Sequence, residues 1–415
     1  MAATFEREIE QAIRDEIIPG CVLHATNRDG SFTYAKALGT LSMRQPRPPL
    51  QLSTTMWIAS CTKLMTSICA MQLVERGQLR LDDPVYPHIP ELQSRPVLTA
   101  LNDDGTVAQE PHKTPITLRH LLTHTSGMAY DGMHPLLVAW AKHHATGDEE
   151  ASKPGTILER FNKPLVFEPG TSWMYGPSLD YVGVLIERVS GKSLEDFMRE
   201  NLWEPLGIRD MSFHLHRRPD LKARMAEMAR RDEETGKVVA IEEDERVKQL
   251  PYLLEDGSEV RDCMGGQGVF ASAEEYIKVL RALLSADQDG DRRVFRNKET
   301  VEEFFTPNLG QGAREMLNAV LQNDVMNNAM GGVPREVVKD WGLGGLLAMG
   351  DLPDGKREGT MVWGGLPNLI WFCDRKAGLT GLYAGQVLPT GDAQIANLMR
   401  KFEAGVYKMY KSRSG

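Results

Sequence analysis

The sequence predicts an α/β (α+β) protein in which one antiparallel sheet, flanked by helices, is assembled from the two ends of the chain. The first observation is a hairpin pattern over residues 21–39, where two apolar runs surround an Asn-Arg-Asp-Gly turn. The second is a series of strand-like runs between Leu343 and Gly385. Residues 81–261 instead show helical patterns that stop at Gly or Pro, which predicts a mostly helical insertion.

These patterns set the expected domain boundaries. Residues 1–80 and 265–415 should form the α/β lobe with the antiparallel sheet, and residues 81–264 the mostly helical lobe. The active site is expected between the two lobes. Two irregular stretches, the charged residues 214–248 and the Asn-, Gly- and Met-rich residues 307–340, are candidate lids or surface excursions.

The composition is that of an ordinary globular protein and excludes several classes of function. The chain has 415 residues, of which 41% are hydrophobic and 25% charged. Its net charge of −9 argues against nucleic acid or an anionic membrane as the main partner. No apolar run approaches the ~18–20 residues that cross a bilayer, and the N-terminal helix pattern contains no apolar signal-peptide core. We therefore expect a cytoplasmic protein.

The five cysteines are scattered along the chain and form no C-x-x-C pair. This pattern indicates neither a disulfide framework nor a zinc ribbon. Four of the cysteines lie in apolar stretches, and we expect these four thiols to be buried and reduced. Cys61 follows a candidate nucleophile directly, but on a helix it points about 100° away, so we expect it to be a packed thiol.

The most informative motif is Ser60-Cys61-Thr62-Lys63, at the start of a helix pattern that runs to about Arg76. Residues three apart share one face of a helix, so the Ser60 hydroxyl and the Lys63 amine can meet. A serine hydroxyl becomes a nucleophile when a neighbouring base takes its proton, and a desolvated lysine can serve. The motif alone is also compatible with a solvated helix turn.

Two later segments supply the other elements that a seryl ester mechanism needs. Tyr175 stands after a Pro-Gly turn and just before a helix pattern, and is the candidate proton relay. Trp363, Gly364, Gly365 and Leu366 lie within a strand-like run. Adjacent glycines in a strand allow a ligand or backbone to approach closely. The backbone N–H of Leu366 would then pair with that of Ser60 around an oxyanion.

Five motifs occur in a fixed order along the chain. They are S-x-x-K at Ser60, LRHLLTHTSG at 118–127, Tyr175 before its helix, GGQGVFAS at 265–272 and W-G-G at Trp363. This set resembles the class C β-lactamase and penicillin-binding-protein-like serine esterase family. The resemblance covers nearly the whole chain. Within the family it is greatest to the lovastatin-type diketide acyltransferases, which are transesterases of polyketide assembly.

The resemblance implies a β-lactamase/transpeptidase-like fold with an active site between lobes. By position, Ser60 would be the nucleophile, Lys63 its helical partner, Tyr175 the relay, and the Ser60 and Leu366 N–H groups the oxyanion hole. Two departures argue against antibiotic hydrolysis. Pro177 replaces the asparagine of the family's Tyr-x-Asn motif, and Trp363 replaces the lysine of its Lys-Thr-Gly strand. Esterase and acyltransferase branches share the W-G-G version.

Two proton routes remain open from the sequence. A Lys63 ammonium about 4 Å from Tyr175 would contribute roughly 4 kcal/mol at an effective dielectric of 20, enough to make the phenol a base near neutral pH. Alternatively, a neutral Lys63 deprotonates Ser60 directly and Tyr175 passes the proton to the leaving group. The two groups titrate as a coupled pair.

The acceptor of the acyl group determines whether the enzyme is a transferase or an esterase. Only the family resemblance gives information about the identity of this acceptor. It implies transfer from an acyl thioester donor to a hydroxyl of a polyketide-like secondary metabolite, without cofactor or metal. The donor would be free or held on an acyl carrier protein. The apolar side chains of Trp173 and Trp363 would suit a bulky acceptor, or they are ordinary core residues. A serine carboxylesterase with water as acceptor, and a non-catalytic scaffold, are the alternatives.

Three further signals have weaker interpretations. The basic residues between Arg217 and Arg231 are a candidate carrier-docking surface, although a solvated charged segment is the simpler interpretation. His120 and His124 are spaced like metal ligands but lack the glutamate of H-E-x-x-H, so we expect structural roles. No G-x-S-x-G motif is present, which argues against a Ser-His-Asp α/β-hydrolase.

Overall fold

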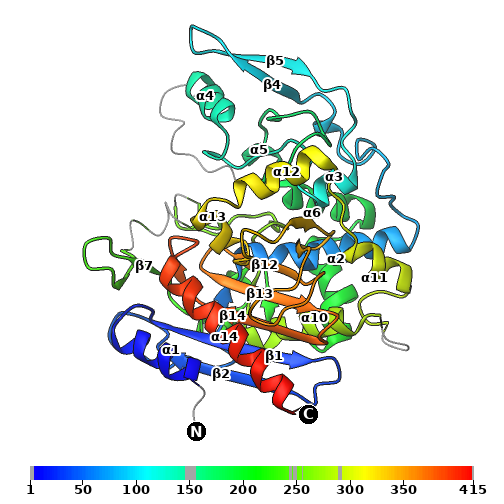
Figure 1. Ribbon diagram of the computed structural model, residues 1–415. Helices are drawn as coiled ribbons and strands as arrows, with labels where there is room; N and C mark the ends of the chain where they lie inside the picture. The colour runs from blue at the N-terminus through cyan, green and yellow to red at the C-terminus, as the bar shows by residue number, and fades with distance from the viewer. Residues whose placement is uncertain are drawn as a thin grey trace.

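The computed structural model describes residues 4–144, 156–242, 245, 250–254, 256–287 and 292–413. A seven-stranded antiparallel sheet forms its centre, in the order β10-β11-β12-β13-β14-β1-β2 (Figure 1). The strands are β1 (Gly20–Asn27), β2 (Thr33–Gly39), β10 (Lys339–Trp341), β11 (Leu346–Ala348), β12 (Met361–Gly365), β13 (Leu369–Asp374) and β14 (Leu379–Ala384).

The sheet joins the two ends of the chain, as the sequence predicts. The N-terminal strand β1 pairs with the C-terminal strand β14, with Val22 opposite Ala384 and Asn27 opposite Leu379. Every residue of β13 and β14 is buried, which explains why these strands read as continuous apolar runs instead of alternating ones. The predicted hairpin is the β1–β2 pair.

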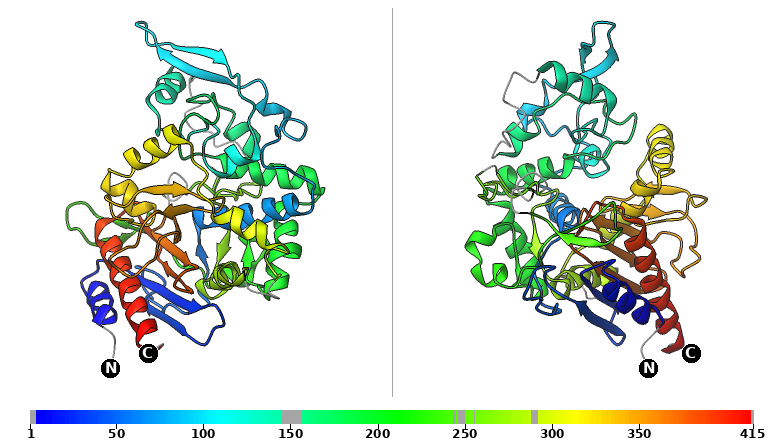
Figure 2. Two further views of the ribbon diagram at one scale, coloured as in Figure 1. Left: turned by 45° about the vertical axis from the view of Figure 1, so that its right-hand side comes forward. Right: turned by 90° about the vertical axis from the view of Figure 1, so that its left-hand side faces the viewer.

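Helices cover both faces of the sheet. The helices are α1 (Thr4–Arg14), α2 (Thr62–Glu75), α3 (Leu118–Leu122), α4 (Pro135–His144), α5 (Ile157–Arg160), α6 (Ser178–Ser190), α7 (Leu194–Met198), α8 (Pro219–Lys222), α10 (Ala273–Ser285), α11 (Lys298–Phe305), α12 (Gln311–Val320), α13 (Asp324–Ala329) and α14 (Ala393–Arg413). Short turns are η1 (Ala59–Cys61), η2 (Pro90–Leu92), η4 (Arg199–Trp203), η5 (Glu204–Leu206) and η6 (Leu215–Arg217). Helices α1 and α14 pack together on one face and α10 on the other (Figures 1 and 2).

The helical middle of the chain also contains strands that the sequence patterns do not reveal. A hairpin of β4 (Pro96–Leu101) and β5 (Val107–Pro111) projects from the end of the molecule opposite the termini (Figure 2). Strands β3 (Met56–Trp57), β9 (Phe270–Ala271) and β6 (Met211–Ser212) form one small sheet, and β15 (Val387–Leu388), β7 (Ala229–Arg231) and β8 (Val238–Ala240) another. The expected mostly helical lobe thus also contains short strands, and the two-lobe boundaries remain a prediction.

The two predicted excursions contain regular structure. Residues 214–248 include α8 and the β7–β8 hairpin, although 243–244 and 246–248 lie outside the described residues. Residues 307–340 include α12, α13 and β10. Within the described part of the chain, no helix combines the length and apolar character that a membrane span requires.

Candidate active site

Ser60 lies in the turn η1, between the strand β3 and the buried helix α2. The residue before it, Ala59, adopts a left-handed conformation with φ of +44°. Non-glycine residues occupy this region only where the surrounding structure holds them, and such residues cluster at functional sites. Ser60 itself is partly exposed, whereas Ala59 and Cys61 are buried. The turn thus presents the hydroxyl of Ser60 to solvent from an otherwise closed core.

Lys63 follows one turn later and points back to Ser60. Its Nζ lies 3.2 Å from the Ser60 Oγ and 2.7 Å from the carbonyl oxygen of Gly266. Helix α2 is buried on all sides over most of its length, which leaves the Lys63 side chain only 3% exposed. The predicted helical spacing therefore brings the hydroxyl and the amine together, in a desolvated environment.

Tyr175 approaches Ser60 from the other side. Its phenol donates a hydrogen bond to the Ser60 Oγ at 2.6 Å. The residue lies in the loop before α6, with Pro177 at the N-cap of that helix. The Lys63 Nζ also lies 4.7 Å from the centre of the Tyr175 ring. The three residues that the sequence singles out therefore meet at one point, although they come from two segments more than 100 residues apart.

Burial shifts the pKa values of the two candidate bases in opposite directions. Desolvation lowers the pKa of Lys63 to about 8, against a smaller opposing effect of the Asp180 carboxylate. Desolvation raises the pKa of Tyr175 above its ordinary value, although its hydrogen bond to Ser60 opposes the change. At pH 7 the environment thus favours a neutral phenol, and a lysine of which roughly one tenth is neutral.

Two residues that the sequence analysis missed complete the polar network. The Lys63 Nζ lies 3.4 Å from the Tyr130 hydroxyl, which donates in turn to Asp180 Oδ2 at 3.4 Å. Asp180 is fully buried in the first turn of α6, and desolvation raises the pKa of its carboxyl. The sequence did contain a signal for Asp180, because this carboxylate lies on the buried face of the predicted helix. Burying an isolated carboxylate is energetically costly, so a charged residue at such a position calls for a partner.

The GGQG segment connects Asp180 to Lys63. The backbone N–H of Gly266 donates to Asp180 Oδ1 at 3.0 Å, while its carbonyl accepts from Lys63. A Cβ atom at Gly266 would lie 2.4 Å from Asp180 Oδ2. Only glycine fits between these two side chains, so the segment positions the lysine through its backbone.

Strand β12 forms the far wall of the site. Its last residue, Gly365, packs against the turn before Ser60, so closely that a Cβ atom there would lie 2.4 Å from the Ile58 carbonyl oxygen. The ring of Trp363 lies 5.2 Å from that of Tyr175. Leu366 follows the strand and is partly exposed. This contact brings the backbone of the W-G-G-L segment beside the nucleophile.

Ser60 opens into a cavity of about 550 Å³. Most of its wall is apolar or aromatic, and the polar groups are few. The lining residues include Ser60, Tyr130, Asp131, Met133, Arg160, Phe161, Tyr175, Met326, Met330, Trp363, Gly364, Gly365 and Leu366. Met326 and Met330 belong to the predicted 307–340 excursion, which therefore contributes to the wall. A cavity with this lining suits a bulky apolar molecule oriented by a few polar contacts.

Trp173 has a different position from the one expected. It is fully buried, and its ring contacts Trp341 at 5.7 Å and His124 at 6.2 Å. It is absent from the described cavity lining. His124 is buried too, and its ring lies 4.9 Å from that of Tyr175, tilted by 56°. We therefore assign Trp173 to the packing behind Tyr175, and not to a substrate contact.

His120 and the basic segment have structural partners, whereas both ring nitrogens of the buried His124 lack a hydrogen-bond partner among the described residues. His120 Nδ1 accepts a hydrogen bond from the N–H of Thr117 in a capping box of α3. Most arginines of the basic segment form ion pairs within the chain. These are Arg218 with Asp210 and Asp220, Arg224 with Asp210, Arg230 with Glu245, and Arg231 with Asp392. The capping box and the ion pairs favour the structural interpretation of His120 and of the basic segment.

Comparison with known proteins places this site in a family. The chain matches the family described as Beta-lactamase over residues 5–403, and it belongs to that family. It is 37% identical to monacolin J acid methylbutanoyltransferase of Aspergillus terreus over 98% of this chain and 95% of the relative. It is also 35% identical to the lovastatin esterase of Penicillium rubens over the full length of both chains.

A solved structure has the same fold. The LovD9 mutant of simvastatin synthase from Aspergillus terreus superposes with a TM-score of 0.86 at 38% identity, covering 98% of each chain. The β-lactamase-like fold and the resemblance to lovastatin-type acyltransferases are thus confirmed. Its relatives include both acyltransferases and an esterase, the two enzymatic alternatives that the sequence left open.

Proposed function

We propose that this protein is a serine acyltransferase that moves an acyl group from a thioester, through an acyl-Ser60 intermediate, to a hydroxyl of a polyketide-like acceptor. The observation that carries the proposal is the position of the Ser60 Oγ, 2.6 Å from the Tyr175 hydroxyl and 3.2 Å from the Lys63 Nζ, on the wall of a largely apolar cavity. A nucleophile held between two proton-transfer groups is the arrangement that acyl transfer requires.

Lys63 is the better candidate for the base that activates Ser60. A pKa of about 8 leaves part of the amine neutral near neutral pH. The phenol of Tyr175, whose pKa is raised, would give its own proton to the departing thiolate and then take the proton of the acceptor hydroxyl. Lys63 would return the Ser60 proton when the ester product leaves. The N–H groups of Ser60 and Leu366 are proposed as the oxyanion hole, where each donor typically contributes ~3–4 kcal/mol.

The lining of the cavity supports an acceptor with an apolar body and an anionic group. Arg160 lies in the wall, and its hydrogen bonds to described residues come from Nη1, to the Pro251 carbonyl oxygen at 2.7 Å and to Met264 Sδ at 3.9 Å. Its remaining donors suit a carboxylate, which guanidinium groups bind in a bidentate manner. The relative named for monacolin J acid acts on an acceptor that is itself an acid. We propose that Arg160 orients the carboxylate of a comparable acceptor.

The donor is proposed to be an acyl thioester with a short branched chain, because the relative is named as a methylbutanoyltransferase. Delivery on an acyl carrier protein would require a docking surface. The arginines predicted for that surface are largely paired with carboxylates of this chain. The proposal therefore rests on the thioester itself, free or carrier-bound. We retain the cytoplasm as the proposed location, where the five free thiols would stay reduced.

A serine carboxylesterase is the second candidate, and its support is the full-length similarity to lovastatin esterase. The two reactions share the acyl-enzyme and differ only in what releases it. Intact-mass spectrometry after incubation with a 2-methylbutanoyl pantetheine thioester would detect the adduct, and peptide mapping would locate it. A chase with water alone, or with polyketide alcohols, would then follow its discharge.

An adduct on Ser60 that alcohol discharges much faster than water supports the transferase. Equal discharge in the presence and absence of alcohol supports the esterase. Ser60→Ala and Lys63→Ala should each abolish the adduct with little change in circular dichroism or melting temperature. A labelled Ser60→Ala protein would contradict the assignment of the nucleophile.

A further inference from the structure

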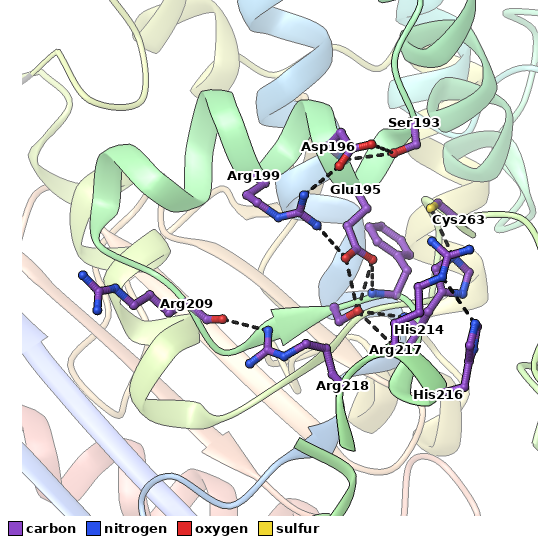
Figure 3. Close-up of polar contacts among 12 residues, drawn as sticks. Ser193, Glu195, Asp196, Arg199, Arg209, His214, His216, Arg217, Arg218 and Cys263 are labelled. Carbon is purple, nitrogen blue, oxygen red and sulfur yellow. Dashed lines mark hydrogen bonds and ion pairs between the residues drawn. The ribbon is translucent and has the colours of Figure 1, made fainter. Parts of the chain in front are cut away.

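A buried cluster of metal-binding side chains lies outside the active site. Glu195 of α7, His214 after β6, and Cys263 are 8%, 2% and 7% exposed. They come from three separate segments, and Figure 3 shows their side chains converging. One ligand atom from each lies within 4.8 Å of the other two. Because the three residues are far apart in the sequence, their spacing matches no metal-binding motif.

The spacing of the cysteine and histidine atoms fits a bound zinc ion. Cys263 Sγ lies 3.6 Å from His214 Nε2. Zinc binds thiolate sulfur at about 2.3 Å and imidazole nitrogen at about 2.05 Å, and two such ligands at the tetrahedral angle lie roughly 3.6 Å apart. The two atoms are thus already separated by one edge of a zinc coordination tetrahedron.

His214 lacks the partners that a buried imidazole normally has. Its Nδ1 is buried without a hydrogen-bond partner among the described residues, and its Nε2 meets only the weakly polar Cys263 sulfur. The orphaned Nδ1 is not the atom that faces Cys263, so the case for a metal depends on Nε2, which has no stronger partner than a thiol in the described part of the chain.

Glu195 is held rigidly toward the cluster. Its carboxylate accepts hydrogen bonds from the Ser212 hydroxyl at 3.1 Å and the Phe213 N–H at 2.8 Å, and it pairs with Arg199 at 2.8 Å. These contacts are visible as dashed lines in Figure 3. Metal-binding carboxylates are usually fixed by such outer contacts.

The outer side of the cluster offers an entrance and two more ligands. His216 and Glu259 form a second group with His214, again with all ligand atoms within 4.8 Å. His216 is exposed and bonds Glu259 Oε2 through Nδ1 at 2.9 Å. The exposed Arg217 lies over this side, with its Nε 3.3 Å from His216 Nε2. Because His214 is only 2% exposed, a cation approaching from this side would have to displace the Arg217 side chain.

We propose that Cys263, His214 and Glu195 form a site for a borderline-soft divalent cation of the zinc class, with a fourth position open toward His216. Mixed sulfur, nitrogen and oxygen ligands of this kind select zinc over magnesium or calcium. Binding replaces the S–H bond of Cys263 with a sulfur–metal bond and releases one proton to solvent. No redox change is involved.

The expected role is structural. The ion would clamp α7, the segment after β6 and the chain at Cys263 to one another. Cys263 stands three residues before Gly266, whose carbonyl accepts the hydrogen bond from Lys63. The clamp would thus stabilise the backbone that positions the catalytic lysine, while touching no substrate.

Cobalt(II) is the probe that tests the site, because a thiolate–cobalt bond absorbs in the near ultraviolet. The full chain would be stripped with a chelator and titrated with Co²⁺, then with competing Zn²⁺. We expect about one equivalent of cobalt, a thiolate charge-transfer band, and a zinc-dependent rise in melting temperature. His214→Gln and Cys263→Ser should each remove the band, and Arg217→Ala should tighten binding severalfold. Cys69→Ser, which replaces a buried thiol of α2, should leave the band unchanged.

The cobalt titration of the wild-type protein is by itself enough to refute the proposal. The test therefore does not depend on whether the variants fold. Absence of the charge-transfer band at millimolar cobalt would refute the site. A band that survives in both His214→Gln and Cys263→Ser would place the metal elsewhere and refute it equally. Neither measurement depends on acyl transfer, so the result is independent of the proposed function.

Discussion

The Lys63 ammonium position lies closer to the Gly266 carbonyl oxygen, at 2.7 Å, than to the Ser60 hydroxyl, at 3.2 Å. A neutral amine has two N–H donors and one lone pair. If the donors point at Gly266 and at the Tyr130 hydroxyl, 3.4 Å away, the lone pair faces Ser60. The same three oxygens would also satisfy the three N–H donors of a protonated amine. The pH dependence of acylation therefore distinguishes the two forms.

The first prediction concerns the pH dependence of acylation. A base acts in its deprotonated form, so the rate should rise with pH through the Lys63 pKa of about 8 and level off above it. Single-turnover acylation by a chromogenic ester, measured from about pH 6 to about pH 10, checks this. A rate that still rises at about pH 10 without a plateau near the Lys63 pKa would instead identify a Tyr175 phenolate as the base. Tyr175→Phe should reduce the rate by roughly 10²–10⁴ without moving the midpoint.

The second prediction is that Asp180→Asn moves this midpoint to lower pH. The Asp180 carboxylate raises the pKa of Lys63, so its removal should lower that pKa. The shift should be on the order of one pH unit, which corresponds to about 1.4 kcal/mol. The amide oxygen can still accept from the Gly266 N–H, so the fold should persist.

Asp131→Asn is the matched control for Asp180→Asn. This carboxylate also lines the cavity, but its side chain is 73% exposed and it pairs with Lys163. Solvent screens an exposed charge of this kind. Asp131→Asn should leave the midpoint of the pH–rate profile unchanged. An equal shift in both variants would show that the shift is not a specific effect of the Asp180 carboxylate.

Sequence patterns correctly predict the elements that depend on interactions between residues close together in the chain. Helical spacing brings Ser60 and Lys63 together, and the turn chemistry of residues 27–30 forms the β1–β2 hairpin. The short hairpin β4–β5 was missed because its strands are largely exposed and their sequences, PVLTAL and VAQEP, lack the alternation that marks a half-buried strand. Its Asn-Asp-Asp-Gly turn was the remaining signal.

The polar network behind Lys63 was missed for a different reason. Tyr130, Asp180 and Gly266 lie 67, 117 and 203 positions from Lys63, and only the folded chain brings them together. Motif reading finds residues whose order along the chain is known, such as Tyr175. It does not find a carboxylate that acts through the backbone of a distant glycine.

The third prediction tests the close contact between β12 and the Ser60 turn. A Cβ atom in Gly365→Ala would lie 2.4 Å from the Ile58 carbonyl oxygen, so the strand or the turn must shift. Displacement of the proposed oxyanion donor on Leu366 should lower the acylation rate by roughly 10²–10³. Gly350→Ala, whose Cβ would lie 3.5 Å from the nearest side chain, is the control and should retain activity. Wild-type acylation by Gly365→Ala would rule out this wall as part of the site.

The fourth prediction separates binding of the acceptor from chemistry. If Arg160 pairs with an acceptor carboxylate, Arg160→Gln should raise KM for acidic acceptors and leave KM for the corresponding methyl esters unchanged. A hydrogen bond to a charged group typically contributes about 1.5–3 kcal/mol, which corresponds to a roughly 10- to 150-fold change in KM. Lys163→Gln is the control, because this cation lies nearby but already pairs with Asp131. Acylation by the thioester should be the same in all three proteins, since it precedes acceptor binding. A parallel loss for acids and esters would show that Arg160 supports the wall of the cavity through its bond to the Pro251 carbonyl, and does not contact the carboxylate.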